Sequence, residues 1–346
     1  MNGRQLLAMS VAAGVGAALA AARRAQDSFS FAGKAALITG GSRGLGLVMA
    51  RELVAQGAKV AILARDQADV SRAASELSER GGQVLAIHGD IRDQSVARRA
   101  VDDTVRQFGG IDVLINNAGV IQVGPLDHMT VQNFEEALGV HMWGPLYTTL
   151  AAVPHMRRQG GGRIVNISSV GGRVSVPHLL PYCASKFALV GLSDGLRAEL
   201  AADDILVTTV CPGLMRTGSH LNALFKGRHP QEFTWFAIFD SLPLLSMDAG
   251  VAARQILDAC RRGDPSLTLS LPARVLAAAD ALLPDLVASA MRVMGQLLPA
   301  AGSGTADQVR TGWESRSPLA PSLLTRLNDR AAVENNNLRG HAPPHR

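Results

Sequence analysis

Short apolar runs alternate with helix-like stretches from residue 34 onward, and this alternation constrains the fold more than any other feature of the chain. Strands that are apolar throughout are typical of parallel sheets covered by helices on both faces. Right-handed crossovers between such strands favour a doubly wound, Rossmann-like parallel sheet, so we predict an α/β fold with a single catalytic domain. The expected strands are 34–39, 59–63, 83–88, 112–116, 163–168, 205–211 and 266–271.

The stretches between these runs have helical periodicity, and the chain divides into four regions. Hydrophobic residues make up 47% of the chain and aromatic residues only 4%, a balance that suits a layered α/β protein. The expected helices are 44–56, 67–80, 95–108, 131–158, 182–202 and 247–262. The expected regions are an apolar N-terminal segment (1–30), the Rossmann-fold domain (31–270), an apolar helical extension broken at Pro284 and Pro299 (271–302), and a polar, flexible tail (303–346).

Charge and cysteine content narrow the partners. The net charge is +5, but no dense run of Lys and Arg is interleaved with aromatic residues, so we expect no nucleic-acid partner. A basic surface would still be attracted to an anionic membrane. Cys183, Cys211 and Cys260 form no CxxC motif and no His cluster has ligand spacing, which predicts reduced thiols, no disulfide and no metal site.

The N-terminal segment has no charge from Leu6 to Ala22 and is followed by Arg23 and Arg24. Three interpretations remain open: a membrane anchor, a cleaved signal peptide, and an alanine-rich helix on the protein surface. If the segment spans a membrane, the two arginines predict a cytoplasmic catalytic domain. We therefore expect the protein in the cytoplasm or at the cytoplasmic face of a membrane.

The sequence TGGSRGLG (39–46) stands between the first strand and the first helix. Glycines at 40, 44 and 46 permit a tight turn and let the backbone approach a pyrophosphate, while the helix directs its first amides at the phosphates. This turn predicts a dinucleotide site, and the alternative is a purely structural turn. The expected contacts are Gly40, Ser42, Arg43, Gly44, Leu45 and Gly46.

The end of the second strand bears on which dinucleotide binds. A site selective for NAD usually presents a carboxylate to the ribose 2′-hydroxyl there, but this strand ends in Ala64 and Arg65. A guanidinium binds a 2′-phosphate in a bidentate manner, and Arg43 would add a second positive contact. Asp66 comes one position too late for the ribose. NADP(H) is the expected cofactor.

Ser169, Tyr182 and Lys186 fall within one short span, with the tyrosine and the lysine four residues apart. Residues four apart lie on the same face of a helix. A free phenol has a pKa near ~10, so catalysis near neutral pH needs a neighbouring group that stabilises the phenolate. The lysine is positioned to do this.

Four motifs in this order resemble the short-chain dehydrogenase/reductase family: TGGSRGLG, NNAG (116–119), the Ser–Tyr–Lys set and PG (212–213). The similarity covers roughly residues 33–262. It implies that Tyr182 is the general acid or base, that Lys186 stabilises the phenolate and holds the nicotinamide ribose, and that Ser169 binds the substrate oxygen.

The same resemblance assigns roles to further residues. Asp90 and Ile91 would contact the adenine, and Asn116 would tie the central strand and line the cofactor cleft. Residues expected to line the nicotinamide half of the cleft are Asn117, Ala118, Gly119, Pro212, Gly213 and Thr217.

His141 departs from the family pattern, which often has an Asn at this position that supports a water-linked proton relay to the lysine. An imidazole both donates and accepts, so a relay through His141 is one hypothesis. The alternative is a buried histidine without a catalytic part.

These observations predict an NADP(H)-dependent oxidoreductase that interconverts a carbonyl and a secondary alcohol on a small lipophilic substrate. Two alternatives are a 3-oxoacyl thioester reductase, with Lys226 and Arg228 as a weak carrier site, and a catalytically weak NADP-binding scaffold at a membrane. Large aromatic residues at 225, 233, 235 and 236 would form either a substrate lid or ordinary core. The resemblance implies a homodimer or homotetramer paired through helices 131–158 and 182–202.

Overall fold

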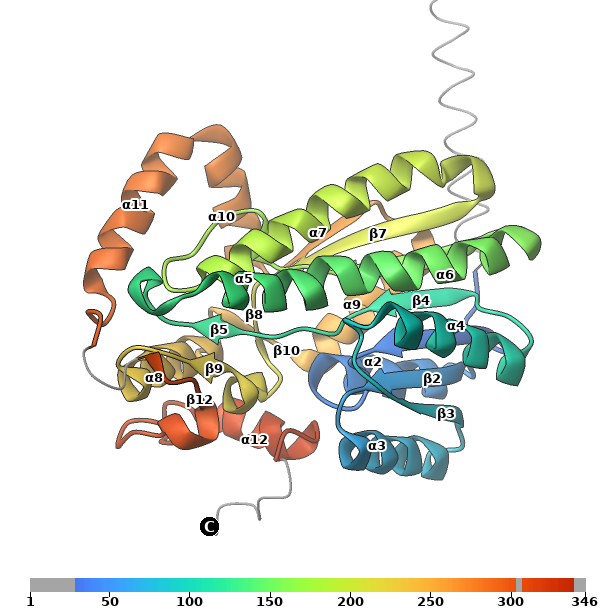
Figure 1. Ribbon diagram of the computed structural model, residues 1–346, viewed down its shortest axis with the longest axis horizontal. Coiled ribbons are helices and arrows are strands. Elements are labelled where there is room, and N and C mark those ends of the chain that lie inside the picture. The colour runs from blue at the N-terminus through green and yellow to red at the C-terminus, as the bar shows by residue number, and fades with distance from the viewer. Residues whose placement is uncertain (1–28, 303–306, 339–346) are drawn as a thin grey trace, which may run out of the picture.

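Seven parallel strands form the central sheet of the computed structural model, which describes residues 29–302 and 307–338. β1 lies between β2 and β4, so the order of the strands reverses beside β1 (Figure 1). The predicted doubly wound, Rossmann-like sheet is confirmed. Across the sheet the strands are β11 (Ser266–Leu269), β7 (Ile205–Pro212), β6 (Gly162–Ile167), β4 (Val113–Asn116), β1 (Ala35–Thr39), β2 (Lys59–Ala64) and β3 (Gln83–His88).

Helices cover both faces of this sheet because its strands are apolar on both sides. Leu37 packs into one layer and the next residue, Ile38, packs into the other, and neither side chain is exposed. One layer contains α2 (Gly44–Ala55), α3 (Gln67–Glu79) and α9 (Ala249–Arg262), and the other contains α4 (Gln94–Phe108), α6 (Gly144–Arg158) and α7 (Leu180–Glu199).

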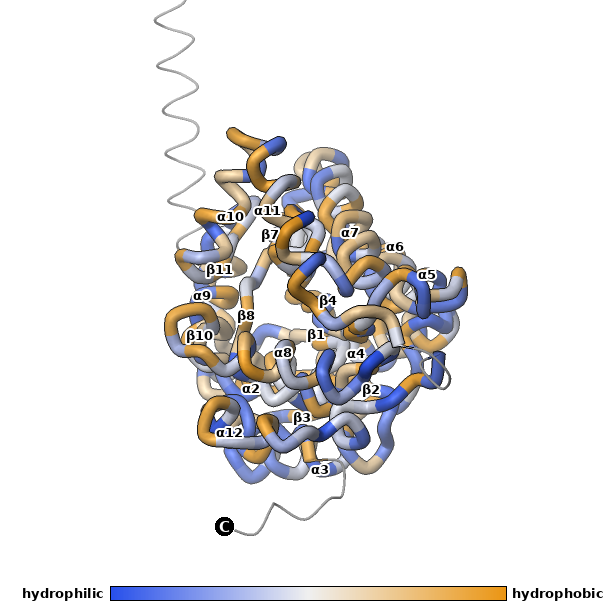
Figure 2. The backbone as a smooth tube through the Cα atoms, turned by 90° about the vertical axis from the view of Figure 1, so that its left-hand side faces the viewer, coloured by the Kyte–Doolittle hydropathy of each residue, from blue (hydrophilic) through white to orange (hydrophobic). Residues whose placement is uncertain are grey.

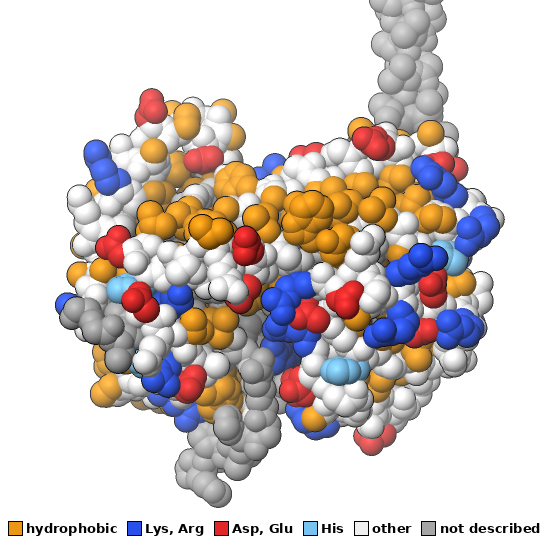
Figure 3. Space-filling view, viewed as in Figure 1, with side chains coloured by type: hydrophobic (Ala, Val, Ile, Leu, Met, Phe, Trp, Pro, Cys, Tyr) orange, Lys and Arg blue, Asp and Glu red, His pale blue; other side chains and the backbone are white. Residues whose placement is uncertain are grey.

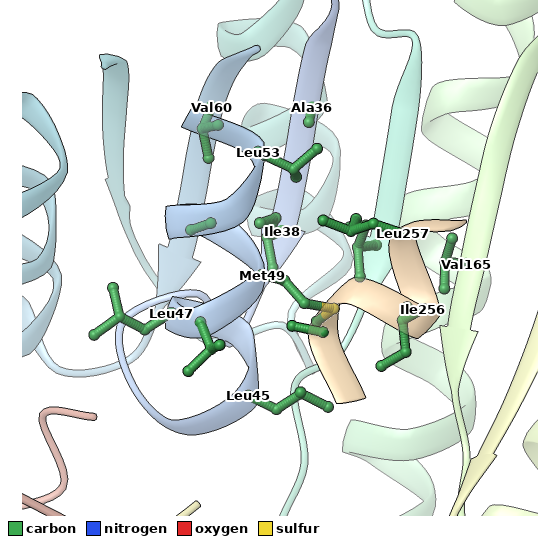
Figure 4. Close-up of a cluster of buried hydrophobic side chains, with 14 of the residues drawn as sticks. Ala36, Ile38, Leu45, Leu47, Met49, Leu53, Val60, Val165, Ile256 and Leu257 are labelled. Carbon is green, nitrogen blue, oxygen red and sulfur yellow. The ribbon is translucent and has the colours of Figure 1, made fainter. Parts of the chain in front are cut away.

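The contact between α2 and α9 fixes the helix that follows the glycine turn. Met49 and Leu53 of α2 meet Ile256 and Leu257 of α9 above the strands (Figure 4). All four side chains are buried. This packing holds the N-terminus of α2 against the carboxyl end of β1.

The helix predicted over 131–158 is interrupted. α5 (Val131–Leu138) leads into a π-helical turn at Gly139–Trp143, after which α6 begins. Pro145 has no N–H to donate to the carbonyl four residues earlier, which removes one α-helical hydrogen bond at this place. The π turn buries His141 completely.

Smaller elements pack below the carboxyl ends of the strands around a separate hydrophobic core (Figure 1). Phe225, Phe233 and Phe236 are buried in it, which favours the core interpretation of these aromatic residues over the lid. The elements here are β5 (Gln122–Val123), β9 (Leu224–Phe225), α8 (His229–Ser241), β12 (Arg310–Thr311) and α12 (Arg326–Glu334). A separate pair of strands, β8 (Leu214–Arg216) and β10 (Ser246–Asp248), packs Met215 and Met247 against the core that contains α2 and α9.

The prediction of a flexible, poorly packed tail over 303–346 is wrong for residues 307–338. α12 packs tightly enough that a Cβ on Gly218 would lie 2.2 Å from Cα of Ala332. Asn328 is fully buried and donates to Asp240 at 3.0 Å. The prediction was wrong because it took polar composition as a sign of poor packing. Polar side chains such as Asn328 pack here by forming buried hydrogen bonds.

The apolar extension forms two helices, α10 (Leu271–Leu282) and α11 (Pro284–Leu297), separated near Pro284 as expected. Both leave large hydrophobic side chains in contact with solvent, including Leu282 and Leu297, and the pair stands out from the rest of the chain in Figure 2. Within the described residues, no helix combines the length and the apolar character needed to cross a bilayer. The apolar segment 6–22 lies outside the described residues.

Candidate active site

A cleft of about 430 Å³ opens at the carboxyl ends of the central strands. It is lined by residues that follow β1, β2, β3, β4, β6 and β7, at the edge where ligands of doubly wound sheets bind. The cleft brings together nearly all the predicted site residues, which are Gly40, Ser42, Arg43, Gly44, Leu45, Arg65, Asp90, Ile91, Asn117, Ala118, Gly119, His141, Ser169, Tyr182, Lys186, Pro212, Gly213 and Thr217.

Gly46, like Asn116, is a predicted residue that does not line the cleft. A Cβ there would lie 2.2 Å from the carbonyl oxygen of Gly40, so this glycine allows α2 to approach β1 closely. Gly40 has a left-handed φ of 67°, and a Cβ on it would lie 2.8 Å from Cα of Ala118. Only glycines fit this turn, and the resulting cradle suits a phosphate at the N-terminus of α2.

Asn117 holds the glycine turn from the side. Its Nδ2 donates to the carbonyl oxygens of Thr39 and Gly40, both at 3.1 Å. Asn116 is buried in a different network, where it donates to Asn166 at 2.8 Å and ties β4 to β6. The strand-tying expectation for Asn116 agrees with this bond. The expectation that Asn116 lines the cleft is wrong, because its buried side chain belongs to this network and Asn117 lines the cleft instead.

Two arginines and two carboxylates surround the far end of the glycine turn. Arg65 is exposed at the rim of the cleft. Arg43 contacts Asp69 at 3.5 Å and donates to Asn222 at 3.3 Å. The Asp66 carboxylate caps α3 by accepting from the Asp69 amide at 2.9 Å. The Asp66 carboxylate is thus bound to the N-terminus of α3. The guanidiniums of Arg43 and Arg65 are the groups here whose charge suits a ligand phosphate.

Ser169, Tyr182 and Lys186 converge in the cleft. Ser169 follows β6, while Tyr182 and Lys186 lie one turn apart on α7. Nζ of Lys186 donates to the Ile167 carbonyl at 2.8 Å and lies 5.7 Å from the centre of the Tyr182 ring. Two adjacent elements therefore bring a hydroxyl, a phenol and an ammonium to one place.

Burial controls the protonation of this cluster. It raises the pKa of the Tyr182 phenol, and a hydrogen bond with Ser169 opposes that rise. Burial also lowers the pKa of Lys186 to about 7. At neutral pH the phenol therefore carries its proton, which is the state needed in a general acid.

His141 is committed to structural hydrogen bonds. Its Nε2 accepts from the Val120 amide at 3.1 Å, so the neutral ring carries its proton on Nδ1, which lies 2.7 Å from Oγ of Ser185. Ser185 in turn donates to the Tyr182 carbonyl at 2.8 Å. Neither ring nitrogen is directed at Lys186.

Apolar side chains also line the cleft, among them Ile121, Met215 and Leu224. Trp235 and the buried phenylalanines lie in the separate core and do not line the cleft. Lys226 is buried, with its ammonium held by the His128 carbonyl and Asn133, both at 2.9 Å.

The cleft residues that the sequence analysis missed include three polar ones near the glycine turn and the C-terminal segment: Asp69, Asn222 and Asn337. Asp69 lies in the first turn of α3, where acidic residues are common on helix surfaces, so nothing in the sequence indicated that it lines the cleft. Asn337 belongs to the run ENNN, whose polarity indicated a tail. This run of three asparagines was the available signal that the segment is ordered, because their side-chain amides can form hydrogen bonds with backbone carbonyl and amide groups of other segments.

Two further expectations concern cysteines and metals. The three cysteines are buried and unpaired. Among residues 29–302 and 307–338, no group of three His, Cys, Asp or Glu side chains is arranged to hold a metal ion.

Comparison with the sequences of known proteins adds three relationships. A family model described as short chain dehydrogenase matches residues 34–224. An uncharacterized oxidoreductase of Thermotoga maritima is 34% identical over 203 residues, or 59% of this chain and 80% of the relative. The 11-beta-hydroxysteroid dehydrogenase 1A of Arabidopsis thaliana is 36% identical over 197 residues, 56% of each chain.

A solved structure shares the fold. The L-sorbose reductase from Gluconobacter frateurii, complexed with NADPH and L-sorbose, matches with a TM-score of 0.63 at 24% identity. The match covers 70% of this chain and 96% of the reductase.

Proposed function

Because the chain belongs to the short-chain dehydrogenase family, a family of oxidoreductases, we propose that it interconverts a carbonyl and a secondary alcohol with NADP(H). The observation that carries the proposal is the convergence of Ser169, Tyr182 and Lys186 at one end of a cleft whose other end is a glycine turn. One end suits chemistry at a substrate oxygen, and the other suits a phosphate-bearing cofactor.

Each residue of the cluster has a distinct task in this proposal. Tyr182 donates its proton to the carbonyl oxygen during reduction and takes it back during oxidation. The Ser169 hydroxyl donates a hydrogen bond to the same oxygen as charge develops on it. Lys186, when protonated, stabilises the phenolate that Tyr182 becomes. The bound nicotinamide supplies or accepts the hydride.

The preference for NADP(H) is supported by charge at the ribose end. Arg65 and Arg43 both line the cleft, and Ala64 stands where a carboxylate would select NAD. The Asp66 carboxylate is occupied as the cap of α3. The NADPH named for the L-sorbose reductase belongs to that protein and agrees with this assignment.

A lipophilic substrate is supported by the apolar wall of Ile121, Met215 and Leu224. The 3-oxoacyl thioester alternative has lost support, because the Lys226 ammonium is buried and already bonded. That leaves Arg228 as its remaining candidate for an acidic carrier.

Assembly and location are part of the proposal. An apolar band that includes Trp143, Leu150 and Phe187 is exposed along α6 and α7 and the turn before α6, and Figure 3 shows this band across one face. It supports a homodimer or homotetramer paired through these helices. The exposed leucines of α10 and α11, together with the apolar segment 6–22, support a place at the cytoplasmic face of a membrane, and cytoplasm without a membrane is the alternative.

The test is turnover of hydrophobic ketones and aldehydes followed by nicotinamide absorbance, with NADPH and NADH compared. Tyr182→Phe is the matched variant because it removes only the phenolic hydroxyl. We expect turnover with NADPH, a loss of about 10²-fold or more in the variant, and retained cofactor binding. Tight NADPH binding with no turnover of any compound would favour the scaffold alternative instead.

A further inference from the structure

The C-terminal strap, which we define as residues 334–338, crosses the glycine turn. The carbonyl of Asn335 accepts from the Gly44 amide at 2.9 Å, at the first position of α2. Nδ2 of Asn336 donates to the Ser42 carbonyl at 2.8 Å. The strap therefore binds two residues of the turn that we assign to the cofactor phosphates.

Helices α2 and α3 hold the same side of the strap. Arg51 of α2 donates to the Asn335 side chain at 3.1 Å and to the Glu334 carbonyl at 2.9 Å. Arg72 of α3 donates to the Asn336 side chain at 3.1 Å. These contacts join the strap to the nucleotide-binding half of the domain.

The other side of the strap is joined to the segment that follows β8. Nδ2 of Asn337 donates to the Thr217 carbonyl at 2.8 Å, and Asn222 donates to the Asn337 backbone carbonyl at 3.1 Å. Asn337 is 1% exposed. The strap thus bridges two walls of one cleft through short, directional contacts.

Asn337 also faces the cleft directly. It is one of the lining residues, and a Cβ on Gly44 would lie 3.8 Å from its Nδ2 and 3.9 Å from Cβ of Thr217. Asn337 and Thr217 therefore lie beside Gly44 of the glycine turn and line the same cleft. A ligand phosphate at the turn would lie next to them.

The chemistry of the strap suits this position. Asn335, Asn336 and Asn337 offer amide donors and acceptors without a negative charge that would repel a phosphate. Glu334, the strap's acidic residue, is exposed and paired with Arg330 on the surface of α12. Asn336 has a left-handed φ of 56°, a conformation that asparagine tolerates better than most residues.

We propose that the C-terminal strap is a clasp over the phosphates of the bound dinucleotide, and that opening its contacts with Ser42 and Gly44 limits the rate at which the cofactor leaves. This rests on the proposed function, since it takes the cleft as an NADP(H) site. The strap forms a side of the phosphate site that the strands and α2 do not form.

The test measures release of NADPH from the full-length protein by stopped-flow fluorescence after mixing with excess NADP⁺. Asn336→Gly removes the side-chain contacts to Ser42 and Arg72 while keeping a residue that adopts a left-handed φ. Asn336→Asp keeps the size of the side chain but replaces the donor with a charge that repels phosphate. Arg330→Ala is the matched control, because it removes an exposed ion pair on α12, the helix that leads into the strap, without touching the contacts to Ser42 and Gly44.

We expect Asn336→Gly to release NADPH about fivefold faster or more, the factor that one lost hydrogen bond typically gives, and Asn336→Asp to release it at least as fast. Arg330→Ala should match the wild type. If both Asn336 variants melt like the wild type and release NADPH at the wild-type rate, the clasp is refuted while the proposed function stands. If the wild type binds no NADPH at all, both proposals fail.

Discussion

Nδ1 of His141 lies 2.7 Å from Oγ of Ser185, and this serine donates to the backbone carbonyl of Tyr182 at 2.8 Å. The chain of hydrogen bonds begins at the Val120 amide, so it links the loop after β4 to the first turn of α7. Burial, helped by the nearby charge of Lys186, lowers the pKa of His141 well below its ordinary range. A neutral ring with both nitrogens engaged is suited to positioning Tyr182.

Replacing His141 by leucine tests positioning against relay. The change leaves the Val120 amide without its acceptor and takes the imidazole donor away from Ser185, which keeps its bond to the Tyr182 carbonyl, so we expect the free energy of unfolding to fall by about 2 kcal/mol. Turnover should fall with it, because Tyr182 loses its support. Urea denaturation and steady-state kinetics measure both quantities. A variant with wild-type stability and a large loss of kcat would instead indicate that His141 carries protons.

The proposed NADP preference depends most on Arg65, because Arg43 already contacts Asp69 and Asn222. Arg65→Ala should raise the KM for NADPH about tenfold to a hundredfold, since hydrogen bonds to charged groups contribute about 1.5–3 kcal/mol. The KM for NADH should change little, because NADH has no 2′-phosphate. Equal effects on the two cofactors would mean that Arg65 does not contact the 2′-phosphate.

Lys186 predicts a pH dependence of cofactor use. Burial lowers its pKa from the ordinary 10.5 to about 7, so in the free enzyme the ammonium is charged below that pH and neutral above it. If the charged form is the one that receives the cofactor, kcat/KM for NADPH should fall as pH rises, by about tenfold one unit above the pKa.

Lys186→Arg supplies the comparison for this pH profile. A guanidinium keeps its charge across the whole range, so the fall above pH ~7 should disappear even where activity is lower. A melting curve checks that the buried arginine is accommodated. An unchanged alkaline limb in this variant would assign the titration to another group.

The sequence was informative where short segments determine geometry. Gly40 and Gly46 are needed by a turn that no Cβ fits, and Tyr182 and Lys186 are brought together by one helical turn. The apolar runs predicted the sheet for the same reason, since a strand covered on both faces must be apolar on both.

Contacts between distant residues were beyond such patterns. Asn336 reaches Ser42 across 294 positions, and nothing near either residue signals the contact. The partners of His141 depend on a π turn that helical periodicity does not reveal. Residues 303–346 are polar, and folded segments usually bury apolar surface, so the sequence predicted a flexible tail. In the structure, α12 packs through small alanines and buried asparagine side chains.

The docking of α12 can be tested with two glycines that share a backbone conformation. Gly218 has φ 83° and Gly81 has φ 84°, so alanine is equally strained at both. A Cβ at Gly218 would lie 2.2 Å from Cα of Ala332, whereas nothing lies within 4 Å of one at Gly81.

Gly81→Ala should therefore cost only the backbone strain, about 1 kcal/mol. Gly218→Ala should in addition push α12 and the strap away from the cleft, because Cα of Ala332 is backbone and cannot rotate aside. Limited proteolysis should cleave the C-terminal segment early in Gly218→Ala and not in Gly81→Ala, while the two variants keep the same far-UV circular dichroism. If the protease cleaves the segment equally slowly in both variants, the contact at Gly218 does not hold α12 in place. The contacts of the strap with Ser42 and Gly44 would then be sufficient to keep the segment docked.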